Sequence, residues 1–164
     1  MIDRDTKRSL GQMMKGVQVV GASHDGLVRA YCSHWVCQVS FEEPIVMASI
    51  SPRHDTYPLI RGSGRFTVSI LAGDQVAAGQ YFSYPGRRFH HLADELIELN
   101  ADGLPVVVDA IAWLQGEVFE IKESWEDGTP LGWGGTGPAT PGPPPAPGCA
   151  GGAPRRASRR GPPV

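Results

Sequence analysis

Proline is concentrated at the C-terminal end of this 164-residue chain, and this asymmetry limits where a folded domain can lie. Ten of the 15 prolines fall between residues 129 and 164, mixed with glycine, alanine and arginine. Proline removes the amide donors that helices and central strands need. A segment this poor in aliphatic side chains cannot bury enough apolar surface to offset the entropy lost on ordering. We therefore predict a folded domain over residues 1–128 and a disordered Pro/Gly/Arg-rich tail over residues 129–164.

Composition excludes several classes of protein for residues 1–128. No apolar run approaches the ~18–20 residues that cross a bilayer, and the N-terminus lacks the basic-then-apolar order of a signal peptide. The net charge of -2 argues against a specific nucleic-acid surface, so the arginines of the tail are interpreted as solvated charge. Three cysteines, Cys32, Cys37 and Cys149, indicate neither a disulfide framework nor a closed zinc site. We expect a cytoplasmic protein without a membrane segment or a metal.

The hydrophobic pattern predicts short antiparallel strands with helices inserted between them. Asp25–Gly26 between two β-branched runs is a strong hairpin signal. Asp55 and Asp74 are expected to cap two of the helices, and Gly16 and Gly62 to end helices. This pattern is typical of a mainly β fold, a small β-barrel with short helices. The predicted strands cover residues 17–23, 27–33, 35–40, 45–51, 66–71, 106–108 and 112–124, and the predicted helices cover residues 5–15, 55–62, 74–82 and 88–96.

Two polar loops, residues 32–40 and 51–56, follow two predicted strands and can lie side by side if those strands pair. The second loop leads into a helix whose N-terminal amides favour a phosphate. Arg53 could bind that phosphate through its guanidinium fork, with the hydroxyls of Ser40 and Thr56 as further donors. The alternative interpretation is purely structural: Asp55 caps the helix and Arg53 is solvated. The residue types alone leave both open.

The order of several short segments resembles the flavin reductase-like family of FMN-binding split barrels. The resemblance covers most of residues 11–125, and it rests on many short matches in the correct order rather than on one decisive motif. The matching segments are Gly16–Val20, His24–Gly26, Gln38–Pro44, Ile45–Ile50, Arg53–Thr56, Leu59–Phe66 and Leu71–Gln75.

This resemblance implies which residues hold the cofactor. In the family, the loop matching Ser33–Ser40 runs along the isoalloxazine, with its backbone amides facing the flavin edge, and the segment matching Arg53–Thr56 closes over the phosphate. An aromatic-serine pair near the ring matches Phe82 and the serine that follows it. No residue is assigned a catalytic role, because the flavin itself performs the hydride chemistry. The expected cofactor-binding residues are Ser33, His34, Trp35, Val36, Cys37, Gln38, Ser40, Ser51, Arg53, His54, Thr56 and Phe82.

The implied function is an NAD(P)H-dependent flavin reductase that transfers hydride to FMN. FMN would be a bound cofactor or a substrate, with FAD or riboflavin as other substrates, and either NADH or NADPH would be the electron donor. Members of the family form homodimers, and an oxygenase partner could receive the reduced flavin.

Several residues keep two interpretations. Trp35 either covers the flavin ring or fills the barrel, and Phe82 either contacts the ring or packs in the core. Cys32 and Cys37, five apart on an extended segment, are expected to be small buried thiols and not a redox pair. His54 and the His90–His91 pair are interpreted as solvated or capping histidines, because no further ligand stands at a suitable spacing.

The resemblance breaks down after residue 125. Where the family has a Gly-Asp-His turn and another strand, this chain continues from Thr129 into Pro130. We therefore expect a split barrel that lacks its last strand, and hypothesise that a frameshift produced the tail. The alternative function is an FMN-binding or vestigial barrel without turnover, because the strand and its histidine turn are lost.

Overall fold

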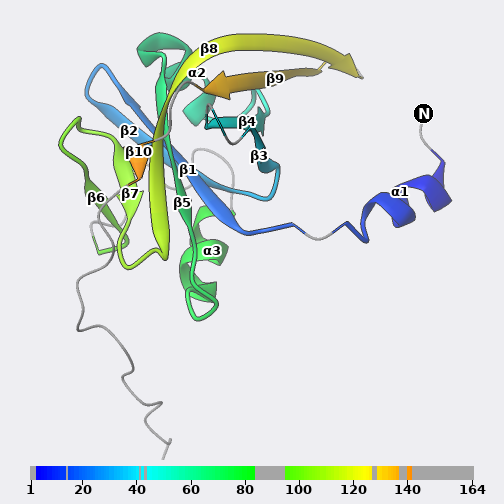
Figure 1. The fold of residues 1–164 in the computed structure, drawn as a ribbon, viewed down its shortest axis with the longest axis horizontal. Helices are drawn as coiled ribbons and strands as arrows, with labels where there is room; N and C mark the ends of the chain where they lie inside the picture. Colours follow the sequence, from blue (N-terminus) through cyan, green and yellow to red (C-terminus); the bar gives the residue numbers. More distant parts are fainter. Residues whose placement is uncertain are drawn as a thin grey trace, which may run out of the picture.

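The computed structural model describes residues 3–13, 15–40, 42, 44–83, 95–126, 129–136 and 140–141. Most of these residues lie in strands, with short helices between them, as the sequence predicts (Figure 1). The three helices are α1 (Arg4–Leu10), α2 (Thr56–Ser63) and α3 (Val76–Phe82). The strands are β1 (Gln18–His24), β2 (Leu27–Ser33), β3 (Val36–Ser40), β4 (Ile45–Ile50), β5 (Arg65–Ile70), β6 (Ile97–Leu99), β7 (Pro105–Val107), β8 (Ala112–Glu126), β9 (Thr129–Thr136) and β10 (Thr140–Pro141).

The strands form an antiparallel split barrel. Their order is β2-β1-β5-β8-β9-β4-β3, with β10 paired to β8, and β6 and β7 form a separate two-stranded ribbon. β8 is 15 residues long and belongs to both halves of the barrel. Its first part pairs with β5, and its later part bends over to pair with β9 (Figure 1). The mainly β fold class predicted from the sequence is therefore confirmed.

The hairpin between β1 and β2 turns at Asp25 and Gly26, as predicted. Both residues have positive φ, 50° for Asp25 and 76° for Gly26, which is the requirement of the tight turn that Asp-Gly favours. The register runs from Gln18 opposite Ser33 to His24 opposite Leu27. This register places Val20 directly opposite Tyr31, so that both side chains enter the barrel core.

The core lies between the inner faces of the barrel strands and the inner face of α2. Phe66, Val68 and Val20 are at most 1% exposed there, and α2 adds Leu59 and Ile60. A second cluster joins α3 to the ribbon through Phe82, Val107, Val19 and Ala110. The inner faces of the strands therefore pack against both helices, α2 in the first cluster and α3 in the second.

Side-chain hydroxyls attach the β6–β7 ribbon to the barrel. The Val107 amide donates to Ser69 Oγ at 3.0 Å, and the Thr67 hydroxyl donates to the Pro105 carbonyl. Gly21 lies at the same contact. A Cβ atom there would stand 2.7 Å from both the Pro105 Cγ and the Pro105 carbonyl oxygen. The ribbon thus approaches β1 so closely that only glycine fits at residue 21.

The helix ends differ in detail from the sequence prediction. α1 ends at Leu10 and not at Lys15. α2 continues past Gly62 and is terminated by Gly64, whose φ of 67° lets its amide donate back to the Ile60 carbonyl at 2.8 Å. α3 is preceded by Gln75 and not by Asp74. Most of the helix predicted over residues 88–96 lies outside the described residues, which omit 84–94.

A strand lies beyond the boundary predicted at residue 128. Residues 129–136 form β9, which pairs with β8 on one side and β4 on the other. β9 therefore stands where the barrel was expected to lack its last strand. Backbone hydrogen bonding on both sides explains this result, since a ladder needs no aliphatic side chains, and Pro130 lies near the start of the strand. The rest of the predicted tail, except Thr140–Pro141, lies outside the described residues.

Within the described residues, no helix has the length and apolar character needed to span a membrane.

Candidate functional site

The two polar loops singled out in the sequence lie side by side, but not through pairing of the strands that precede them: among the described residues β2 pairs with β1, and β4 pairs with β3 and β9. β3 and β4 pair antiparallel, with Val36 opposite Ala48. The Ser49 amide donates to the Trp35 carbonyl at 2.9 Å, which ties the end of β4 to the loop that follows β2. The pairing of these strands therefore brings residues 33–36 next to residues 51–56.

Residues 51–56 form a compact turn, called the 51–56 turn below. The His54 amide donates to the Ser51 carbonyl at 3.0 Å, and the Arg53 amide donates to Ser51 Oγ at 3.3 Å. The Tyr57 amide in turn donates to the His54 carbonyl at 3.0 Å. These hydrogen bonds fold the chain back over Ser51 and lead directly into α2.

The start of α2 has the properties that an anion requires. Asp55 occupies the predicted N-cap position, but its side chain makes no capping hydrogen bond. Arg53 is exposed and forms no ion pair with any described residue, so its guanidinium is available. Thr56 differs from expectation because its side chain is only 2% exposed. Arg53 and the backbone amides ahead of Tyr57 are therefore better placed to meet a phosphate than the Thr56 hydroxyl; the Tyr57 amide is bonded to the His54 carbonyl, and Pro58 has no N–H.

His54 stacks on Tyr31, a residue that the sequence reading did not single out. The two ring centroids are 4.5 Å apart and the planes are inclined by 25°. Burial lowers the pKa of His54 below its usual 6.5, and the Asp55 carboxylate opposes this in part, so the imidazole is neutral near pH 7. Tyr31 comes two residues before Ser33 on β2, so period-2 alternation alone could have placed both side chains on the inner face of the strand.

The Tyr31 hydroxyl is a buried polar group without a hydrogen-bond partner among the described residues. Only 6% of the residue is exposed. Burial raises the pKa of this phenol well above its usual value; the Ser33 side chain lies close enough to oppose the rise in part, although it does not reach the geometry of a hydrogen bond to the Tyr31 hydroxyl. The Ser33 hydroxyl instead accepts a hydrogen bond from the Trp35 amide at 3.1 Å. Tyr31 therefore stands between the two loops and touches the second through its ring.

A large open cleft lies beside the first loop. Its volume is ≈ 500 Å³, enough for part of a dinucleotide or a flavin ring. Gln75 holds one wall in place: its side-chain carbonyl accepts from the Ala72 amide at 2.9 Å, and its amide donates to the Val108 carbonyl at 2.8 Å. Of the predicted residues, Ser33 and His34 line this cleft. The other lining residues are Val17, Cys32, Leu71, Ala72, Gly73, Gln75, Val76, Gly79, Gln80 and Ser83.

Other predicted residues line a second hollow at the mouth of the barrel. Its volume is ≈ 270 Å³, and Val36, Cys37 and Gln38 face it. Cys37 is exposed, so the expectation of a buried thiol is wrong there. β3 is an end strand of the sheet, and no strand of the described residues lies on its outer side. Cys32 is partly buried against the α3 cluster. Ser40, at the end of β3, offers its carbonyl to the Gln38 side chain at 3.0 Å.

Trp35 and Phe82, which each had two interpretations, take different positions. Trp35 is 50% exposed, so it does not fill the barrel. His34 meets its ring edge-on at 5.7 Å, and the Lys15 ammonium lies 5.8 Å from its centroid. Phe82 is only 3% exposed and packs with Val19 in the core, so it does not line the cleft. The neighbouring Ser83 does line it.

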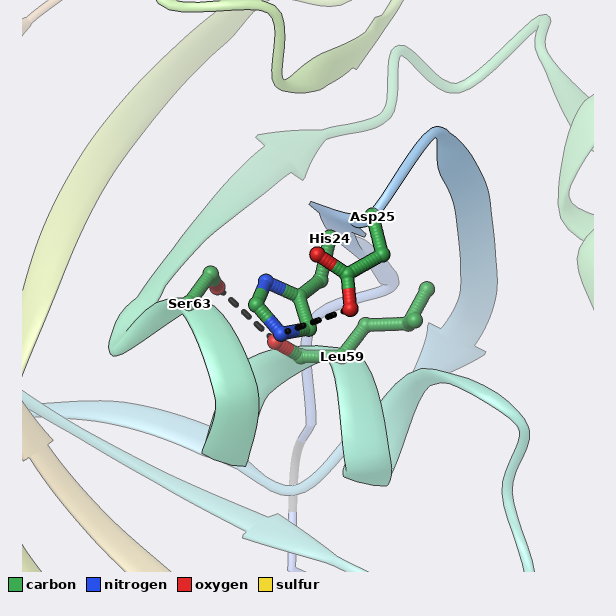
Figure 2. Close-up of polar contacts among 4 residues, drawn as sticks. All are labelled: His24, Asp25, Leu59 and Ser63. Carbon is green, nitrogen blue, oxygen red and sulfur yellow. Dashed lines mark hydrogen bonds and ion pairs between the residues drawn. The ribbon is translucent and has the colours of Figure 1, made fainter.

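The far end of α2 is held by the β1–β2 hairpin (Figure 2). His24 packs against Gly62 so closely that a Cβ atom there would overlap the imidazole ring. The His24 Nε2 lies 3.5 Å from the Asp25 carboxylate, whereas the nearby Ser63 hydroxyl donates to the Leu59 carbonyl at 2.8 Å. Serine, histidine and aspartate therefore gather here without forming a nucleophilic triad, because the serine proton is committed to the helix backbone. The contact instead anchors α2.

Metal ligation is not supported where the chain is described: no cluster of three or more His, Cys, Asp or Glu side chains is placed to hold an ion. His90 and His91 lie outside the described residues.

Comparison with known proteins agrees with this geometry. The sequence profile of the flavin reductase like domain matches residues 10–130. The reductase component of a 4-nitrophenol 4-monooxygenase/4-nitrocatechol 2-monooxygenase from Rhodococcus opacus is 28% identical over 114 residues, which are 70% of this chain and 60% of that protein. An NADH-dependent flavin reductase from Rhodococcus sp is 28% identical over an aligned length of 142 residues, and the match covers 76% of this chain and 78% of that protein.

The solved structure of the flavin reductase PheA2 in its native state superposes with a TM-score of 0.65 and 26% identity, covering 83% of this chain and 85% of that one. Against other curated relatives the chain spans a smaller share, 45% and 22% of their lengths. The family match spans most of the described domain and includes both loops of the site. The chain therefore belongs to the flavin reductase like domain family.

Proposed function

We propose that this protein binds FMN across the two adjacent loops and reduces it with NADH or NADPH. The observation that carries the proposal is the placement of the 51–56 turn beside the loop between β2 and β3, in a chain of this family. One loop offers an anion site and the other lies against an open cleft. A flavin mononucleotide has a phosphate at one end and a flat ring at the other, and these two features match that arrangement.

The phosphate would be held at the 51–56 turn. Arg53 supplies a charged fork without an internal partner among the described residues. Of the first residues of α2, Pro58 has no N–H and Tyr57 donates its amide to the His54 carbonyl, so the backbone donors left for a phosphate are the amides ahead of Tyr57. Ser51 and His54 would shape this site through their mutual backbone bond, since they set the direction in which Arg53 leaves the turn. The Thr56 hydroxyl would contribute only after a local adjustment, because it is buried.

The ring would lie along β3 and the loop before it. β3 ends the strand order, so the backbone groups on its outer side have no strand partner among the described residues. Such amides are suitable donors for the polar edge of a flavin, whose reduced form carries negative charge there. Ser33, His34, Trp35, Val36, Cys37, Gln38 and Ser40 would surround this edge, mainly through their backbones. When bound, the flavin supplies the hydride acceptor.

The chain's own residues would position the electron donor and not activate it. The ≈ 500 Å³ cleft beside His34 is open on one side and has glycines at residues 73 and 79, which leave room for a flat ring. Its walls are held by Gln75, so the space is preformed. Positioning two reactants face to face is the main contribution that a protein makes to hydride transfer between cofactors.

We further propose a homodimer and transfer of reduced flavin to an oxygenase. The oxygenase proposal rests on the relative from Rhodococcus opacus, which is the reductase component of a monooxygenase. The dimer proposal rests on exposed apolar side chains near the site, among them Val39 at 54%, Ile70 at 38% and Val76 at 62% exposure. Light scattering would report the dimer, and pull-down with a co-expressed oxygenase would report the partner.

The test of FMN binding uses one variant and one matched control. Arg53→Gln should weaken FMN binding by about tenfold or more, because a hydrogen bond between charged groups is lost, and should leave riboflavin binding unchanged. Arg61→Gln removes the same charge from the other end of α2 and should change neither. Equal effects of the two variants on FMN would contradict a phosphate site at the turn.

The test of turnover is an anaerobic titration of the flavin-loaded protein with NADH and NADPH. Bleaching of the flavin absorption with stoichiometric donor is the expected result. Bound flavin that neither nucleotide bleaches would instead support the alternative function, a flavin-binding barrel without turnover. The sequence observation that favours the alternative is the absence of a Gly-Asp-His turn after residue 125. Protein that takes up no flavin at all would contradict both.

A further inference from the structure

We propose that Tyr31 is a positioning residue for flavin phosphate, acting by holding His54 and thereby the 51–56 turn. Tyr31 would not touch the flavin, because it is 6% exposed. The inference rests on the proposed function, in which that turn receives the phosphate. In this proposal Tyr31 contributes more than core packing, because it also sets the position of His54.

His54 is the residue through which the turn is organised. Its amide donates to the Ser51 carbonyl, and its carbonyl accepts from the Tyr57 amide, so it links the first residue of the turn to the start of α2. The side chains of Arg53 and Asp55, on either side of His54, are exposed to solvent and are not packed against the barrel. The orientation of the turn therefore depends strongly on where the His54 side chain is held.

The Tyr31 ring holds that side chain by a stacked contact at 4.5 Å. Tyr31 is itself held in place by packing, because it lies opposite Val20 in the β1–β2 register and belongs to the barrel core. A half-buried imidazole against a fixed aromatic plane has few alternative rotamers. The consequence is that Arg53, one residue earlier, leaves the turn in a defined direction before any ligand arrives.

The role of the Tyr31 ring can be tested separately from that of its hydroxyl. Because this hydroxyl has no hydrogen-bond partner among the described residues, removing it should not disturb the stack. Tyr31→Phe therefore keeps the positioning contact, whereas Tyr31→Leu removes the aromatic plane. Phe66→Leu is the matched control, since Phe66 is a buried aromatic of the same core cluster and does not contact His54 among the described ring pairs.

The experiment measures dissociation constants for FMN and riboflavin, two ligands that differ only in the phosphate. In the unchanged protein, FMN should bind more tightly than riboflavin. Tyr31→Leu should reduce that preference by about 3- to 10-fold, the range expected from one aromatic pair, while Tyr31→Phe and Phe66→Leu should retain it. General loosening of the core would weaken both ligands together and would not move this ratio.

A second measurement does not depend on ligand. The pKa of His54, followed by NMR titration of its ring proton, should rise toward 6.5 in Tyr31→Leu, because the imidazole gains solvent, and should stay lowered in Phe66→Leu. If Tyr31→Leu does not fold, Tyr31→Met fills more of the space and replaces it in both measurements.

The outcomes separate the inference from the function beneath it. An unchanged protein that binds FMN no better than riboflavin would contradict the phosphate site itself. A protein that prefers FMN, and retains the full preference in Tyr31→Leu, would overturn the positioning role alone. Loss of the preference for FMN in both Tyr31→Leu and Phe66→Leu would also overturn the positioning role. Such a result would mean that any damage to the core lowers the preference, whether or not it removes the stack on His54.

Discussion

Replacing Gly21 by alanine tests how closely the β6–β7 ribbon is held against the barrel. The added Cβ would stand 2.7 Å from the Pro105 carbonyl oxygen and Cγ, and 2.8 Å from the Thr67 Oγ1. Carbon contacts are favourable at about 3.5–4.0 Å, so the ribbon must move outward by nearly 1 Å. Two of the three atoms belong to a proline in a strand and cannot rotate away.

The expected cost follows from that displacement. Overpacking of a closed contact costs about 1–3 kcal/mol, and weakening the hydrogen bond from Thr67 to the Pro105 carbonyl adds about 1 kcal/mol. We therefore expect the free energy of unfolding to fall by about 2–4 kcal/mol. For a domain of this size that corresponds to a melting temperature lower by roughly 6–15 °C.

Chemical denaturation measures the free energy of unfolding, and amide hydrogen exchange locates the damage. Exchange at Val107, whose amide is bonded to Ser69 Oγ, should accelerate in Gly21→Ala. Gly79→Ala is the control: its Cβ would lie 3.5 Å from Leu71, an ordinary contact, in the interior of α3. That variant should be more stable by about 0.5–1 kcal/mol, because alanine favours helix over glycine.

The reasoning would be refuted by a Gly21→Ala variant within about 0.5 kcal/mol of the unchanged protein. Such a result would mean that the ribbon shifts at no cost, and that the hydroxyl contacts do not fix its distance from β1. Slower exchange at Val107 would contradict it as well.

Three further predictions concern single residues. Tyr31→Phe should raise the free energy of unfolding by about 1 kcal/mol, because it removes a buried hydroxyl without a described partner; a loss in urea denaturation would show that the hydroxyl is bonded. The pKa of His54 is lowered on folding, so its contribution to stability is full above pH 6.5 and is lost as the pH falls through the folded-state pKa. His54→Asn should accordingly show a shallower decline of stability in that acidic range, and an unchanged slope would contradict the burial of the imidazole. Asp109 has a φ of 57°, so Asp109→Gly should be nearly neutral while Asp109→Val costs about 1–2 kcal/mol; equal melting temperatures for the two would contradict this strain.

Local sequence signals were sufficient for β1 to β5, β7 and β8. The Asp25–Gly26 turn fixes the register of β1 and β2, because positive φ at both positions admits few alternatives. The alternation of β5 and the apolar run of β4 identified buried strands. Since β3 and β4 are adjacent in sequence, their pairing followed from chain connectivity.

Other features depend on partners that no local pattern shows. β6 has only three residues, rich in helix-forming types, and exists because β7 pairs with it. β9 contains proline and glycine and is a strand because β8 and β4 flank it. Phe82 could have faced either the core or the cleft, since a short helix has apolar positions on both sides. Tyr31 lies in β2 and His54 lies in the 51–56 turn. Their stack is a tertiary contact between segments far apart in the sequence, so no local pattern predicts it.

The position of β9 also determines the order in which this barrel can assemble. Without β9, the strand path separates into two parts, β2-β1-β5-β8 and the β4-β3 hairpin. Ile50 and Gly132, which pair when the parts join, are about 80 residues apart in the chain, and such distant pairings form slowly because loop-closure entropy is lost first. We expect the two parts to form early and the closure through β9 to limit the folding rate. During that interval the edges of β4 and β8 are open, and the protein is most exposed to association with other unfinished chains.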